Sequence, residues 1–135
     1  MNDVILKAKN MKDMIYEIRG KQVMLDSDLA KLYQVETKRI NEAVRNNPEK
    51  LPERFSFKLT DEESKNFKVE NFDQKIETRG GRFKNPRVFT EQGVPMLATV
   101  LRTSVASQVS VSIMRAFVEM RKYISTTLVK KVIPV

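Results

Sequence analysis

The 135-residue chain carries 25 lysines and arginines against 17 acidic residues, a formal net charge of +8. This excess favours polyanionic partners, so nucleic acid and an anionic membrane surface are the two candidates. Cysteine and histidine are both absent, which excludes disulfides, zinc sites built from these residues, His-based triads and cysteine nucleophiles. The remaining acids show no motif spacing, so we expect no cofactor, no metal site and no enzymatic activity.

The N-terminus is polar without a signal-peptide pattern, and the longest apolar stretch, around Gly93–Leu101, is far too short to cross a bilayer. We therefore expect a cytoplasmic protein with no membrane partner. The length fits one domain with a modest core. We divide the chain into an N-terminal segment (1–13), a domain (14–125) and a C-terminal tail (126–135).

The first elements are a hairpin and a helix. Met14–Leu25 contains two apolar-rich runs around a turn at Gly20, and glycine allows the positive φ of a tight hairpin turn. The segment Asp26–Tyr33 predicts a helix, and either Asp26 or Ser27 is expected to cap its first amides.

A second helix, a strand and a short third helix are expected next. Thr37 is the cap candidate for a helix over Lys38–Asn46, which ends because Pro48 disfavours helical geometry in the preceding residue. Alternation with period two predicts a strand over Arg54–Thr60. A short helix follows from Asp61, with Thr60 at its start.

The second half of the chain predicts a loop, a strand and two helices. The loop covers Ile76–Pro86 and the strand Arg87–Phe89. Thr90–Gly93 resembles a helix entry, and Pro95 means that this helix either starts late or kinks. Apolar residues at helical spacing predict the longest helix over Val105–Thr126. The fold class is therefore α+β, a single winged helix-turn-helix-like domain with small β-hairpins and a long C-terminal helix.

A helix-turn-helix is predicted over Asp26–Arg45. Ala30 is the small residue that lets two helices pack closely, and Val35 and Ile40 follow at intervals of five. Gln34 stands where a turn glycine is usual, and glutamine tolerates a left-handed turn poorly.

The opposite face of the second helix carries Lys38, Asn41, Glu42 and Arg45 in one stripe, at helical spacing. Arginine and asparagine can pair bidentately with guanine and adenine edges, although such a stripe is also common on a helix that merely faces solvent. We expect DNA contacts in this helix from Thr37, Lys38, Arg39, Asn41 and Arg45.

A basic loop lies between the two predicted strands. It contains Arg79, Arg82, Lys84 and Arg87, two glycines and no acid. A wing occupies this place in a winged helix-turn-helix, and a glycine-rich cationic loop can lie along a phosphate backbone. The alternative is a solvated surface loop.

Several blocks of the chain together resemble a known family. They are Ile18–Tyr33 (IRGKQVMLDSDLAKLY), Thr37–Asn46 (TKRINEAVRN), Arg54-Phe55, Phe89–Val94 (FTEQGV) and Ile113–Val118 (IMRAFV). Their order resembles the open-reading-frame-six N-terminal domain family, which is related to the KilA-N and Bro-N domains of phages, large DNA viruses and prophages. The resemblance implies DNA binding in phage regulators or antirepressors, and no catalytic site.

We therefore expect a sequence-reading, antirepressor-like protein whose partner is double-stranded DNA. The helix Thr37–Arg45 would enter the major groove and the loop Arg79–Arg87 would hold the backbone. Self-association is expected because operator readers are often dimers, and the C-terminal helix packs either on the core of its own chain or on a second copy. The alternative is a protein-interaction module, an antirepressor that binds a repressor protein without reading DNA.

Overall fold

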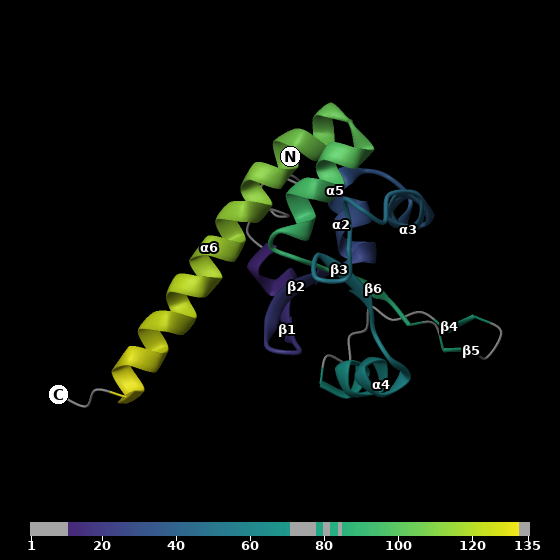
Figure 1. The fold of residues 1–135 in the computed structure, drawn as a ribbon. Coiled ribbons are helices and arrows are strands. Elements are labelled where there is room, and N and C mark those ends of the chain that lie inside the picture. The colour runs from purple at the N-terminus through teal and green to yellow at the C-terminus, as the bar shows by residue number, and fades with distance from the viewer. Residues whose placement is uncertain (1–10, 71–77, 80–81, 84, 133–135) are drawn as a thin grey trace, which may run out of the picture.

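The computed structural model describes residues 11–70, 78–79, 82–83 and 85–132, with side chains over 11–67 and 85–122. The fold is α+β, with helices on both faces of a four-stranded antiparallel sheet of order β1-β2-β6-β3 (Figure 1). The elements are η1 (Met11–Met14), β1 (Ile15–Ile18), β2 (Lys21–Leu25), α2 (Asp26–Tyr33), α3 (Thr37–Asn46), β3 (Ser56–Lys58), α4 (Asp61–Glu70), β4 (Thr78–Arg79), β5 (Arg82–Phe83), β6 (Arg87–Thr90), α5 (Gly93–Leu101) and α6 (Ser104–Val132).

The predicted β1–β2 hairpin is confirmed. Its strands pair up to Ile18 opposite Lys21, which leaves a two-residue turn. Both turn residues have positive φ, 58° at Arg19 and 73° at Gly20. Such a turn matches the right-handed twist of the two strands it joins.

Both faces of the sheet are buried, and alternation along the strands divides the side chains between them. Val23, Leu25 and Val88 pack with Phe67 of α4 on one face. Met24 and Phe89 belong to the larger cluster that contains the buried sides of α2, α3, α5 and α6. The period of two in a strand explains why neighbouring residues enter different clusters.

The turn between α2 and α3 adopts the left-handed conformation despite its glutamine. Gln34 has φ 61° and ψ 44°. The Val35 amide donates to the Ala30 carbonyl oxygen at 3.0 Å, and the Gln34 amide donates to that of Lys31 at 3.3 Å. These bonds satisfy two of the last carbonyls of α2 and end the helix at the turn that leads into α3.

The predicted caps of these two helices are wrong. The cap positions are Leu25 for α2 and Glu36 for α3, and neither has a side-chain capping bond. Each helix thus includes at its start the residue expected to cap it, Asp26 and Thr37 respectively. Ser27, the other candidate for α2, also lies inside that helix. The Asp26 carboxylate is buried instead and bonds to residues distant in sequence.

The predicted strand over Arg54–Thr60 is shorter in the structure, since β3 covers only Ser56–Lys58. The helix expected after it is confirmed and begins with a capping box. The Glu63 amide donates to Thr60 Oγ1 at 3.1 Å, and the Thr60 amide donates to Glu63 Oε1 at 2.8 Å. This reciprocal pair satisfies two amides near the helix start.

The segment predicted as a loop over Ile76–Pro86 contains a second hairpin, so the loop prediction is wrong for β4 and β5. Thr78 pairs with Phe83, and Arg79 pairs with Arg82. The glycines and proline of this segment predict a loop. Its backbone amides and carbonyls nevertheless find partners by strand pairing, which does not depend on a strand-like composition.

Of the two alternatives for Pro95, the structure supports the late start. Pro95 is the third residue of α5, and the first four amides of a helix have no partner within it.

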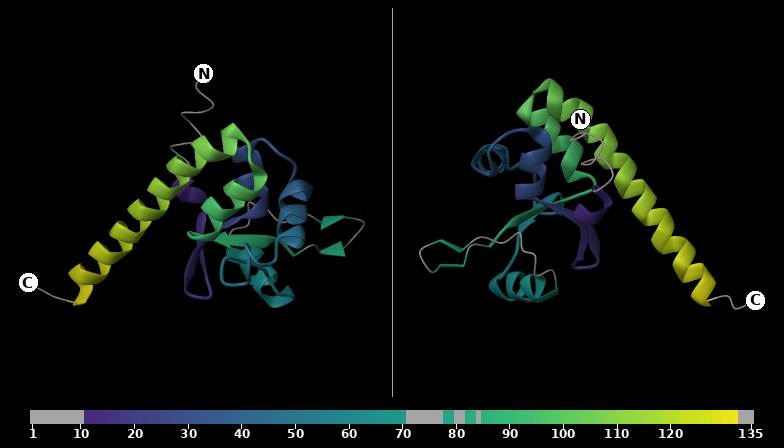
Figure 2. Two further views of the ribbon diagram at one scale, coloured as in Figure 1. Left: turned by 45° about the horizontal axis from the view of Figure 1, so that its top comes forward. Right: turned by 180° about the vertical axis from the view of Figure 1, so that it is seen from behind.

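The helix α6 extends to Val132, beyond the predicted end at Thr126. Its C-terminal half projects from the body of the molecule (Figures 1 and 2). Within the described ranges, not even α6 combines the length and apolar composition of a membrane span.

Candidate nucleic-acid interface

The helix α3 has one buried and one exposed side, as its amphipathic pattern predicts. Ile40 and Val44 are in the core, at 0% and 8% exposure. Lys38, Arg39 and Arg45 are exposed. Thus three of the five α3 residues predicted to contact DNA present their cationic groups to solvent.

Asn41 differs from these cations because its amide already has partners. It is half-buried, and its Nδ2 donates to Asp26 Oδ2 at 3.0 Å and to the Thr37 carbonyl oxygen at 3.1 Å. An asparagine that reads adenine must offer both a donor and an acceptor. The prediction that Asn41 reads a base therefore requires one of these two bonds to break. Thr37 itself is half-buried at the start of α3.

The predicted wing residues fall into three groups. Arg79 is the register partner of Arg82 in the β4–β5 pair. Lys84 lies outside the described residues. Arg87 is half-buried at the start of β6, where its Nη1 donates to Ser56 Oγ at 3.2 Å. The β4–β5 hairpin therefore carries two of the predicted cations, whereas Arg87 belongs to the four-stranded sheet.

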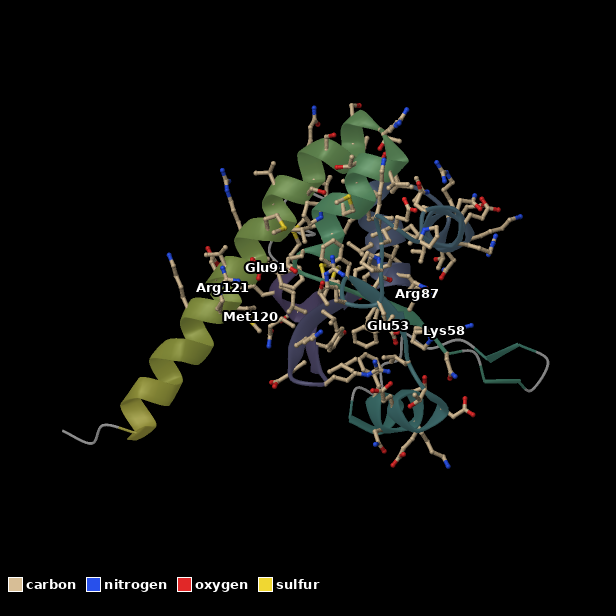
Figure 3. All side chains as sticks on the ribbon, viewed as in Figure 1. Glu53, Lys58, Arg87, Glu91, Met120 and Arg121 are labelled. Carbon is tan, nitrogen blue, oxygen red and sulfur yellow. The ribbon has the colours of Figure 1, made fainter. Side chains whose placement is uncertain are left out.

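Burial lowers the pKa of Arg87, while the nearby carboxylates of Asp26 and Glu53 oppose this shift. The Arg87 backbone amide also donates to Asp26 Oδ2, at 3.3 Å. Figure 3 shows Glu53, Lys58 and Arg87 grouped at the end of the sheet from which the β4–β5 hairpin extends. Charges of both signs therefore lie at the base of this hairpin.

Lys58 is a cation that the sequence analysis missed. It is exposed on β3 and lies opposite Arg87 in the antiparallel register. Its charge could have indicated it, because a lysine is almost never fully buried unless it is paired. Its position beside β6 required the order of the strands, which the sequence pattern does not contain.

The two predicted contact elements lie on one side of the molecule. In Figures 1 and 2, α3 and the β4–β5 hairpin both face away from the projecting end of α6. This side can offer cations to phosphates and hydrogen-bond donors to base edges. Among the side chains that the structure describes, no group of three acids is placed to hold a metal ion.

Comparison with curated proteins and with solved structures gives no match. A family model does match, described as the ORF6N domain, over residues 13–100. The matched segment includes the whole sheet, the α2–α3 pair and α4, and it ends inside α5 before α6 begins. The match covers more than half of the 135 residues. The chain therefore belongs to the ORF6N domain family, a membership that points to a phage-type regulatory domain.

Proposed function

We propose that this protein is a phage-type regulator that binds double-stranded DNA without performing chemistry on it. The helix α3 enters the major groove as the second helix of a helix-turn-helix, and the β4–β5 hairpin is a wing on the phosphate backbone. The observation that carries this proposal is that the exposed cations of α3 and the basic hairpin share one side of the molecule (Figures 1 and 2).

The dimensions and exposure of α3 support insertion into the groove. Its 10 residues correspond to a length of about 15 Å, and the major groove admits one helix. The cationic side is free while the opposite side packs in the core. Lys38 and Arg45 are seven residues apart, so they lie on one face and reach neighbouring parts of the groove.

In this proposal, affinity comes from the wing and from the cations at the adjacent end of the four-stranded sheet. Arg79 and Arg82 contact phosphates, and Lys58 and Arg87 lie at the base of the hairpin. If about six phosphates are contacted, raising the salt concentration from 50 to 200 mM should weaken binding roughly a thousandfold. Sequence choice then depends on α3, because phosphate contacts carry no base information.

A gel shift with mixed-sequence duplex, run from low to physiological salt, tests the proposal. The variant Arg45→Ala should weaken binding severalfold and lower the salt slope by about one, because it removes one cation from the interface. The matched control is Arg115→Ala, since Arg115 is an exposed arginine of α6, and it should bind as the wild type does. If the wild-type protein does not bind duplex at low salt, the proposal is wrong.

Self-association through α6 is part of this proposal. The projecting half of α6 lies away from α3 and the hairpin (Figure 2), so a second copy attached there would leave both contact elements accessible. Operator-binding proteins commonly use such two-fold pairing to read two half-sites. Light scattering should give twice the monomer mass, whereas a monomer at micromolar concentration would contradict the pairing.

A further inference from the structure

One buried carboxylate oxygen connects three elements of the candidate interface. Asp26 is the first residue of α2 and is only 6% exposed. Its Oδ2 accepts the Asn41 amide of α3 at 3.0 Å and the Arg87 backbone amide of β6 at 3.3 Å. The same atom thus holds α3 against the strand that follows the β4–β5 hairpin.

The base of the hairpin is held on its other side as well. Asn85 lies between β5 and β6, and its Nδ2 donates to Asp61 Oδ1 of α4 at 2.7 Å. Arg87 begins β6 two residues later. The backbone at this point therefore has one anchor toward α4 and another toward the α2–α3 pair.

The location of Asp26 is costly for a carboxylate. Burial raises the pKa of Asp26, and the bonds from Asn41 and from the Arg87 and Ser27 amides only partly offset this effect. Removal of the charge alone should therefore not unfold the protein, because the desolvation penalty disappears along with the charge-assisted bonds. A role in positioning can thus be separated from a role in stability.

We propose that Asp26 is a positioning residue that sets the orientation of α3 relative to β6 and the hairpin, and that it thereby controls sequence preference on DNA. The proposal rests on the proposed function. Phosphate attraction tolerates a small rotation of α3, but hydrogen bonds to base edges do not. Disturbing Asp26 should therefore reduce preference among DNA sequences more than it reduces affinity for DNA in general.

The test uses the full chain and a duplex obtained by repeated selection from random sequence. Binding to the selected duplex and to a scrambled one is compared for wild type, Asp26→Asn, Asn41→Ala and the double variant. Asp26→Asn should lower the preference about tenfold, the discrimination carried by one good base contact. Binding to the scrambled duplex and its salt dependence should stay close to those of the wild type.

The double variant separates positioning from direct reading by Asn41. If both residues act through their shared bond, the double variant loses no more preference than Asn41→Ala alone. Losses that add in the double variant would overturn the proposal, as would an unchanged preference in Asp26→Asn. The control Glu17→Gln removes one exposed charge from β1, and an equal loss of preference there would also overturn it.

Amide hydrogen exchange tests the geometry without DNA. The Arg87 amide should exchange slowly in the wild type and faster in Asp26→Asn, because a neutral acceptor forms a weaker bond than a carboxylate. If this amide is unprotected in the wild type, the inference fails even when DNA binding is found. If the amide is protected but no duplex is bound, the proposed function fails, and the role of Asp26 in sequence preference fails with it.

Discussion

Replacing Gly93 with alanine should destabilise the protein, although alanine is ordinarily the better helix former by about 1 kcal/mol. Gly93 is the buried first residue of α5. A Cβ at this position would lie 2.1 Å from the Phe55 carbonyl oxygen, whereas real Cβ contacts essentially never fall below 3.0 Å. The backbone of α5 or of Phe55 must therefore move to accept one methyl group.

The magnitude follows from the bonds that such a movement disturbs. The Phe55 carbonyl oxygen accepts the Thr90 amide at 3.0 Å and the Thr90 hydroxyl at 3.2 Å. Each such bond contributes about 1 kcal/mol, and forcing a methyl group into a packed site costs about 1–3 kcal/mol. After subtracting the gain in helix propensity, we expect a loss of about 2–4 kcal/mol in the free energy of unfolding.

Urea unfolding followed by circular dichroism measures this loss directly. The control is Thr99→Ala, an exposed position in the same helix whose hydroxyl donates to the Pro95 carbonyl oxygen at 3.0 Å. The loss of this exposed bond and the gain in helix propensity oppose each other, so the free energy of unfolding should change by less than about 0.5 kcal/mol. If Gly93→Ala is as stable as the wild type or more stable, the close approach of α5 to Phe55 is refuted.

Three further predictions concern single side chains. Gln34→Gly should raise the free energy of unfolding by about 0.5–1 kcal/mol, because glycine adopts the left-handed conformation without the strain that glutamine has there. This relief of strain outweighs the added entropy of the unfolded chain; a lower urea midpoint than that of the wild type would contradict the prediction. The hydrogen bond from Arg19 is the main reason why the pKa of Glu63 falls from 4.5 to about 2, so the charged form stabilises the fold above pH 4.5 and this contribution is lost as the pH falls toward 2. Thermal melts should therefore show Glu63→Gln less stable than wild type at pH 7, with a gap that narrows on acidification; a gap independent of pH would exclude this linkage. Burial raises the pKa of Tyr33 to about 12, so ultraviolet titration of the wild type should show a late-ionising phase that is missing in Tyr33→Phe; a late phase that persists in this variant at full amplitude would contradict the burial of Tyr33.

The elements that could be predicted are those whose signals are local. The β1–β2 turn depends on Gly20 and its immediate neighbours, and the capping box joins Thr60 to a residue only three positions away. The exposed cations of α3 follow from helical spacing, because Ile40 and Val44 must face the core. These features require no knowledge of what packs against the segment, which is why periodicity and turn chemistry were sufficient.

The candidate site was predicted less completely because its members come from different elements. Asp26 was assigned to a local cap, whereas its bonds reach Asn41 and Arg87, which are 15 and 61 positions away. Lys58 became visible only once β3 was placed beside β6. Both depend on the order of strands and the packing of helices, and a window of neighbouring residues contains neither.

The sequence by itself determined the positions of most helices and strands, the excess of positive charge and the amphipathic face of α3, since each depends on residue type and spacing along the chain. Tertiary structure alone decided that Asp26 is buried, that Gly93 touches a distant carbonyl oxygen, and that α3 and the β4–β5 hairpin share one side. The physical reason is that hydrogen bonds and close contacts between distant residues exist only after the chain has packed, when buried polar groups must find partners wherever the fold brings them.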